Sequence, residues 1–163
     1  MSKLESEVLD ARAFRNTVGN FTTGVTIITT KNKEGHPIGF TANSFSSLSL
    51  DPQLLLFSID KKSSTYQDFM NTEGFVVNIL ASDQIALSKQ FATSGIDRFS
   101  GVSYYEDASG SPVLPDTLAY LDCKVANLFD GGDHTIVVGE VLSGSTAPDK
   151  KPLIFFKGKY LEV

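Results

Sequence analysis

Two runs of residues joined by a four-residue glycine turn constrain the fold of this chain more than any other feature. Residues 119–129, AYLDCKVANLF, alternate in part between apolar and polar side chains, and residues 134–144 read HTIVVGEVLSG. The DGGD sequence at 130–133 joins them, and Asp-Gly and Gly-Asp dipeptides supply the positive φ angles that tight turns between strands require. This pattern predicts a long antiparallel β-hairpin.

Turn residues also bound the other strand-length runs. VTIITT at 25–30 is rich in β-branched residues, and KNKEGHP at 31–37 leads as a turn into IGFTANSF, so these two runs predict a second hairpin. The remaining strands are expected at 54–60, at 75–80 and in a closing pair around LIFF and KYLEV. Helices are expected at 11–21 behind the N-cap residue Asp10, at 63–70 and at 82–92.

The element pattern predicts a mainly β fold. About seven strands and three helices, with hairpins dominant, favour an antiparallel sheet or barrel with the helices packed on its outside. Residues 93–115 show no clear period and are expected to form a long surface loop, which is uncommon unless the loop has a function. The length of 163 residues is that of one domain, so we expect a single unit over 1–163, with 1–10 as a loose tail.

Charge and cysteine content narrow the classes of function. The chain has 14 Lys and Arg residues against 19 Asp and Glu residues, and its net charge of -5 argues against a nonspecific nucleic-acid or anionic-membrane surface. Cys123 is the only cysteine, so no intrachain disulfide forms, and a reducing, cytoplasmic compartment is expected. The start, MSKLESEVLDAR, lacks an apolar signal region and the apolar runs are short, so we expect neither export nor membrane insertion.

Several common catalytic and nucleotide motifs are missing from the sequence. It contains neither G-x-G-x-x-G after a strand nor G-x-x-x-x-G-K-[ST], so a bound nucleotide would use neither a Rossmann turn nor a P-loop. The two histidines, His36 and His134, have no Cys or carboxylate at ligand spacing on a shared helix, so no metal site is expected. The absence of G-x-S-x-G argues against a hydrolase.

The segment GFTANSFSSLSLDP at 39–52 is crowded with hydroxyl and amide side chains. Residues on a strand point alternately to its two faces, so these polar groups need partners on both. Loop capping would satisfy several of them, and a bound anion or heterocycle would satisfy more. The residues alone leave both interpretations open. They also leave open whether His134 simply finishes the hairpin or belongs to a site, and they favour a core position for Cys123.

Six segments between Phe14 and Tyr160 carry a resemblance to a known family. They read FRNTVGNFTTGVTIITT, GFTANSFSSLSLDPQLLLFSID, FVVNIL, DRFSGV, GGDHTIVVGEV and PLIFFKGKY. Together they resemble the flavin reductase-like family with the FMN-binding split-barrel fold, and more narrowly the short-chain reductase component of two-component, flavin-diffusible aromatic monooxygenases. The resemblance implies an antiparallel split β-barrel and a homodimer with a flavin groove near the subunit interface.

The resemblance also implies binding residues. Where relatives can carry arginine near the flavin phosphate, this chain has Ser64, so Arg98 or the pair Lys61 and Lys62 is the expected source of positive charge. Nicotinamide dinucleotide, NADH or NADPH, is expected near His134 and along Phe155, Phe156, Lys157 and Gly158. Flavin, as FMN or FAD, is expected at Pro37, Ile38, Gly39, Phe40, Thr41, Asn43, Ser44, Ser58, Ile59, Asp60, Ser64, Thr65, Gln90 and Phe91.

The implied activity is NAD(P)H-dependent reduction of flavin by hydride transfer, which supplies reduced flavin to a partner monooxygenase. Such chemistry needs no general base, and His134 would position the nicotinamide. Three other interpretations stay open: an FMN-dependent oxidase on the same fold, a flavin-binding protein without NAD(P)H reductase activity, and a β-rich scaffold whose serines cap turns. The sequence also leaves open FMN against FAD, NADH against NADPH, flavin as prosthetic group or substrate, and the partner oxygenase with its aromatic substrate.

Overall fold

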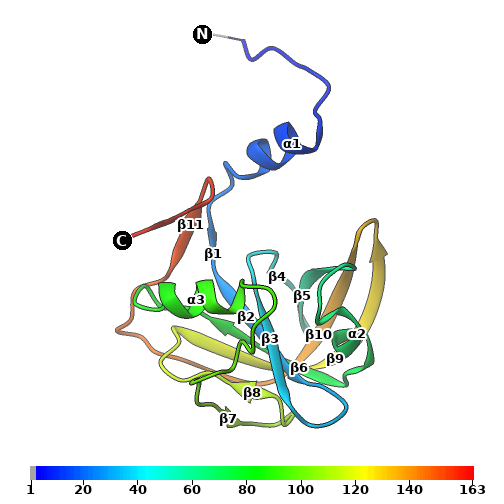
Figure 1. Cartoon of the computed structure of the whole chain (residues 1–163), viewed down its shortest axis with the longest axis vertical. Helices are drawn as coiled ribbons and strands as arrows, with labels where there is room; N and C mark the ends of the chain where they lie inside the picture. Colours follow the sequence, from blue (N-terminus) through cyan, green and yellow to red (C-terminus); the bar gives the residue numbers. More distant parts are fainter. Residues whose placement is uncertain (1–2) are drawn as a thin grey trace.

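A seven-stranded antiparallel sheet that curls on itself forms the centre of the computed structural model, which describes residues 3–163 (Figure 1). Three hairpins, β2-β3, β4-β5 and β9-β10, supply six of its strands, and the order across the sheet is β3-β2-β6-β9-β10-β5-β4. The strands are β2 (Thr26–Lys31), β3 (Pro37–Ala42), β4 (Ser46–Leu50), β5 (Gln53–Asp60), β6 (Gly74–Ile79), β9 (Ala119–Gly131) and β10 (His134–Thr146).

Shorter elements surround this barrel. Helix α1 and a three-stranded sheet of order β1-β11-β12 form an arm that stands away from the barrel in Figure 1. The helices are α1 (Ala11–Val18), α2 (Tyr66–Asn71) and α3 (Ile85–Phe91), and the short strands are β1 (Thr23–Gly24), β7 (Tyr105–Glu106), β8 (Pro112–Val113), β11 (Ile154–Phe156) and β12 (Lys159–Leu161). No helix among residues 3–163 has both the length and the apolar character needed to cross a membrane.

Both predicted hairpins are confirmed. Strands β2 and β3 pair with Thr29 opposite Gly39, and β9 pairs with β10 across a turn in which Gly132 has a φ of 78°. Helix α1 starts behind Asp10, whose Oδ1 accepts a hydrogen bond from the Ala13 N–H at 2.8 Å. The hydroxyl-rich segment contains one strand that the sequence analysis did not separate, β4, because its serines break the apolar pattern.

The prediction of a surface loop at 93–115 is wrong for its second half. This part contains strands β7 and β8 and buries Val113 and Leu114 against β2 and β6. The hydroxyl of Thr29 donates to the Pro112 carbonyl at 2.5 Å, and the Leu114 N–H donates to Asn78 Oδ1 at 2.9 Å. The segment therefore covers a sheet face, and its apolar run at 112–115 is too short to show a period in the sequence.

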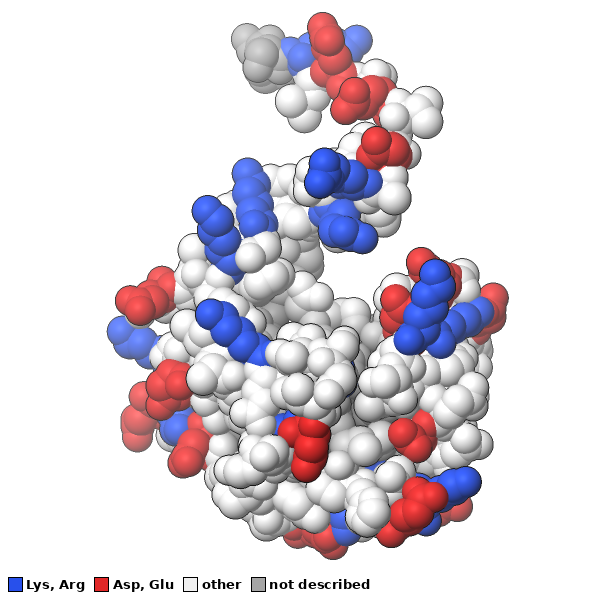
Figure 2. Space-filling view, viewed as in Figure 1, with Lys and Arg blue, Asp and Glu red and all other residues white. Residues whose placement is uncertain are grey.

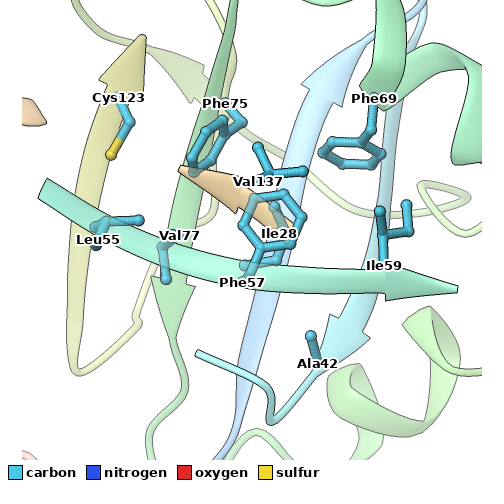
Figure 3. Packing of buried hydrophobic residues seen from close by; sticks show 10 residues of the cluster. All are labelled: Ile28, Ala42, Leu55, Phe57, Ile59, Phe69, Phe75, Val77, Cys123 and Val137. Carbon is cyan, nitrogen blue, oxygen red and sulfur yellow. The ribbon is translucent and has the colours of Figure 1, made fainter. Parts of the chain in front are cut away.

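The first core fills the barrel (Figure 3). Alternate residues of β5 point into it, and the Phe57 ring lies 4.9 Å from that of Phe75 and 5.8 Å from that of Phe69. Such edge-on aromatic contacts add to the large apolar area that the rings bury. The buried members of this core are Ile28, Ala42, Leu55, Phe57, Ile59, Phe69, Phe75, Val77, Cys123 and Val137.

The second core lies outside the barrel. It packs α3, the segment around Phe99 and the start of the arm against the sheet. The ring of Phe99 lies 5.0 Å from that of Phe91 on α3 and 5.6 Å from that of Tyr104, both edge-on. The buried members are Val25, Ile27, Leu80, Phe91, Phe99, Leu114 and Leu153. This core fixes helix α3 and residues 98–104 beside strand β3.

Candidate functional site

The barrel is open between strand β3 and the end of strand β5. Strand β3 is an edge strand, and β4 covers β5 only up to the pair Ser46 and Leu56. Beyond this pair, the Ser44 hydroxyl donates to the Ser58 carbonyl at 2.9 Å and accepts from the Ser58 N–H at 3.1 Å. The Ser44 side chain thus satisfies the backbone groups of Ser58 that a neighbouring strand would otherwise pair, and the opening lies beside it.

Strand β3 carries backbone groups that point away from β2. The Gly39 carbonyl accepts a hydrogen bond from Arg98 Nη1 at 2.9 Å, so the backbone of Gly39 faces the open edge. Alternate residues of a strand present their backbone groups to the same side, so the backbone of Thr41 faces this edge as well. An edge of this kind offers both N–H donors and C=O acceptors to a ligand.

Two adjoining hollows occupy the opening. The first has a volume of about 330 Å³, and Ala42, Ser63, Ala92 and Arg98 complete its wall. It brings together the predicted residues Phe40, Thr41, Asn43, Ser44, Ser58, Ile59, Asp60, Phe91 and His134. The side chain of Ile59 belongs to the first core, so this residue lines the hollow through its other atoms.

The second hollow, of about 630 Å³, lies along the start of β3. It contains the predicted residues Pro37, Ile38, Gly39, Ser64 and Thr65. His36 adjoins them at the start of β3, and the rest of the lining comes from Gly95, Ile96, Asp97, Arg98, Phe99, Val102 and Tyr104. Of these added residues, the sequence analysis assigned only Arg98 to a site. Because Arg98 lines both hollows, it marks the point where they meet.

Arg98 is the predicted cation that lies in the site. Its Nε donates to the Thr93 carbonyl and its Nη1 to the Gly39 carbonyl, both at 2.9 Å. Partial burial lowers its pKa, yet a guanidinium stays protonated and keeps three further N–H donors for a ligand. Lys61 instead forms an ion pair with Asp130, and this hydrogen bond raises the Lys61 pKa. Neither Lys61 nor Lys62 lines the two hollows.

His134 lies at the first position of β10, opposite Asp60 on β5. Its Nδ1 lies 2.7 Å from Asp133 Oδ1, and this hydrogen bond lowers the pKa of the Asp133 carboxyl. The contact holds one side of the imidazole ring, which is 41% exposed. Its Nε2 has no partner among residues 3–163 and is the ring atom that a ligand in the first hollow can use.

Gln90 and the tip of the arm line neither hollow. The Gln90 amide donates to the Arg98 carbonyl at 2.7 Å and to the Ser100 carbonyl at 3.0 Å, so it holds the backbone that carries Arg98. Phe155 and Phe156 end strand β11, and Lys157 and Gly158 form the turn to β12, where the Lys157 N–H donates to the Gly19 carbonyl at 3.0 Å. Their expected contact with nicotinamide dinucleotide stays a prediction.

The polar side chains predicted at the site fall into two groups, those that bond within the protein and those that stay exposed. Thr41 Oγ1 donates to the Ser88 carbonyl at 2.6 Å, and Thr65 Oγ1 lies 3.1 Å from Ser63 Oγ, so these hydroxyls, like that of Ser44, serve the protein itself. Asn43 and Ser64 are exposed beside the hollows. The described residues include no group of three or more His, Cys, Asp or Glu that could hold a metal ion.

The donor set of the two hollows fits a flavin. The half-buried Phe40 and the exposed Ala92 give the first hollow apolar surface, and the β3 edge adds polar backbone groups, which suits a flat ring with a polar rim. A Cβ on Gly39 would lie 2.8 Å from the Ile28 carbonyl oxygen and 3.1 Å from the Phe91 ring, so only glycine lets α3 lie this close. At the junction, Arg98 suits a phosphate. The fold is thus a split barrel, and its open side has the shape and the polar groups that suit a flat heterocycle carrying a phosphate.

The chain belongs to the flavin reductase-like family, because the family model for the flavin reductase like domain matches residues 18–163. It is 41% identical over 155 residues to HsaB, the reductase subunit of a flavin-dependent monooxygenase of Rhodococcus jostii, covering 95% of this chain and 79% of HsaB. It is 44% identical over 151 residues to the FMN reductase (NADH) SmoA of Agrobacterium fabrum, covering 93% of this chain and 85% of SmoA.

Solved structures agree with this family. The NADH:FAD oxidoreductase SgcE6 of Streptomyces globisporus, determined with NAD and FAD fragments, superposes with a TM-score of 0.89 at 33% identity and covers 97% of each chain. These comparisons confirm the predicted family, the antiparallel split-barrel fold and the type of enzyme, an NAD(P)H-dependent flavin reductase of the kind that serves a partner monooxygenase. They agree with flavin and nicotinamide dinucleotide as its cofactors.

Proposed function

We propose that the flavin ring lies in the first hollow, that Arg98 holds the phosphate, and that the reduced flavin leaves to serve a partner monooxygenase. The observation that carries this proposal is the open β3 edge, because free backbone groups there adjoin apolar walls and a partly buried guanidinium. A bound flavin supplies the chemistry by accepting a hydride from the dihydronicotinamide. The chain itself binds, orients and excludes water.

His134 has a positioning role in this proposal. Asp133 fixes its ring through Nδ1, which leaves Nε2 to orient the nicotinamide carboxamide. Replacing His134 by Ala should lower kcat by roughly tenfold to a hundredfold, since misplaced reactants lose about that much rate, while the flavin Kd stays the same. Stopped-flow measurement of the reduction and fluorescence titration of flavin separate the two effects. Unchanged kcat and KM values would refute this role.

A direct assay tests the function as a whole. NADH or NADPH oxidation, followed by absorbance, is measured with riboflavin, FMN and FAD each added in turn. Rapid oxidation that depends on added flavin is the expected result, and reoxidation by a purified monooxygenase component measures delivery. A chain that binds flavin yet oxidises neither dinucleotide would contradict the proposal.

The proposed working form is a homodimer. Leu55, Phe57 and Ile59 point into the barrel, so Leu54 and Leu56 on the same strand point outward. Cross-strand pairing extends this outer face to Ile136 and Phe129, where Phe129 is 52% exposed. A contiguous apolar face of this kind favours a second copy. Sedimentation should give a dimer, and Phe129→Glu should shift it toward a monomer; a monomeric parent chain would rule the dimer out.

The cytoplasm is the proposed compartment. Cys123 is fully buried, and its burial raises the thiol pKa to about 12, so it stays reduced and inert. Figure 2 shows mixed charges at the surface and a mostly uncharged area between the arm and the β9-β10 tip, which suits a small ligand or a second copy better than nucleic acid. Fractionation of cells that express the tagged full chain tests this assignment.

A further inference from the structure

The second hollow is larger than a flavin phosphate needs. Arg98, to which the proposed function gives the phosphate, lies at its junction with the first hollow, and Ser64 and Thr65 line the second hollow. Beyond this junction the hollow continues between the start of β3 and the segment 95–104. Its volume of about 630 Å³ exceeds the 330 Å³ of the first hollow, so a second ring system has room there.

One wall of this extension is an aromatic ring held in place by the second core. The Tyr104 ring contacts the Phe99 ring edge-on at 5.6 Å and an interplanar angle of 79°, and Phe99 contacts Phe91 in the same way. Tyr104 is half-buried and lines the hollow. Aromatic side chains in such positions can stack on nucleobases. Ile96, which is 51% exposed, adds an apolar rim to the hollow.

The charge at the junction suits more than a single phosphate group. Two of the five N–H donors of Arg98 bind the Gly39 and Thr93 carbonyls, and the other three have no partner among residues 3–163. The exposed Ser64 lines the same hollow. Arg98 has free N–H donors and lies between the first hollow and the part of the second hollow lined by Tyr104. This position suits a diphosphate that links two ring systems.

We infer that this chain takes FAD in preference to FMN, with the adenosine of FAD against Tyr104 and its diphosphate at Arg98. This inference rests on the proposed flavin site. Adenosine diphosphate is also half of a nicotinamide dinucleotide, but FAD is the better match because the second hollow is continuous with the proposed flavin hollow. The arm residues Phe155 to Gly158, where the dinucleotide is expected, do not line it.

The test is a pair of titrations that do not depend on turnover. FMN and FAD are titrated into the full chain, and Kd is obtained from flavin fluorescence. FAD should bind roughly tenfold more tightly than FMN, and Tyr104→Ala should remove most of this difference, because one base stacked on an aromatic ring contributes about that much. Ile96→Asp, at an exposed position that should not disturb folding, should weaken FAD selectively as well.

The neighbouring tyrosine provides the matched control. Tyr105 is 50% exposed, lies outside both hollows and contacts Tyr120, so Tyr105→Ala should leave both Kd values unchanged. Equal Kd values for FMN and FAD in the parent chain would overturn the inference. So would Tyr104→Ala and Ile96→Asp variants that weaken both flavins equally, or that raise the KM for NADH with FMN as acceptor. Failure of the parent chain to bind either flavin would instead refute the proposed function.

Discussion

The first core of this protein supports the stability of the barrel, whereas the second core also supports the candidate ligand site. The first core is enclosed by strands, and its central contact joins Phe57 and Phe75 at 4.9 Å. The second core has a similar contact, between Phe91 and Phe99 at 5.0 Å, but these two residues also line the hollows. Damage to the first core should therefore cost stability above all, and damage to the second should also cost ligand binding.

The largest expected effect is a loss of stability on truncation in the first core. Phe57 is fully buried among three other rings, so Phe57→Ala should lower the free energy of unfolding by about 3–5 kcal/mol through lost burial and a cavity. Urea denaturation followed by circular dichroism measures it. A loss below about 1 kcal/mol would mean that the barrel collapses around the gap and that the first core is less rigid than its packing indicates.

The next effect concerns the residue that the second core holds in the site. Arg98→Gln removes the positive charge, so FMN should bind roughly tenfold to a hundredfold more weakly, as expected for a lost charged hydrogen bond. Riboflavin, which lacks the phosphate, should bind equally to both proteins in the same fluorescence titration. Lys62→Gln, an exposed change outside both hollows, is the matched control. Equal weakening of riboflavin and FMN would assign Arg98 a structural role only.

A matched pair of milder changes compares the two cores directly. Phe99→Leu and Phe75→Leu each remove one buried ring and keep an apolar side chain, so each should cost about 1 kcal/mol of stability. Only Phe99→Leu should also weaken flavin binding, because Phe99 supports Tyr104 and follows Arg98 in the chain. Flavin titration and urea denaturation of both variants decide the matter. Equal flavin affinities would show that the second core has no special relation to the site.

The smallest effect lies outside both cores. A hydrogen bond to Asp107 raises the pKa of Tyr120 to about 12. The folded state therefore favours the protonated phenol, and this stabilisation is complete below the ordinary pKa of about 10 and disappears as the pH rises to about 12. The difference in unfolding free energy between the parent chain and Tyr120→Phe should shrink across this window. A constant difference would show that the bond does not persist in solution.

Local sequence patterns predicted the elements that depend on neighbours in the chain. The DGGD turn predicted the β9-β10 hairpin, and Asp10 predicted the start of α1. The segment 93–115 was misjudged because Val113 and Leu114 become buried only when the sheet face exists for them to cover. No local sequence pattern indicates that these two residues will pack on a sheet formed by distant parts of the chain.

The candidate site, too, was predicted only in part from the sequence. The resemblance to the family placed the β3 residues and His134 at one opening. In the structure Phe40, Thr41 and His134 line the first hollow, whereas Pro37, Ile38 and Gly39 line the second. Tyr104 and Ile96 were missed, because they meet the start of β3 only after the chain between them folds back. Their one signal in the sequence was the length of the segment without a period, which is typical of a functional loop.

The open edge of β3 also affects how the protein meets other chains. Unpaired strand edges recruit strands from neighbouring molecules and start intermolecular sheets, the route by which many β proteins aggregate. Here the Arg98 side chain covers the Gly39 carbonyl, and the Ser44 hydroxyl takes up both backbone groups of Ser58 on the opposite side. Arg98 and Ser44, which border the opening, therefore also hinder strand pairing between molecules at these two edges.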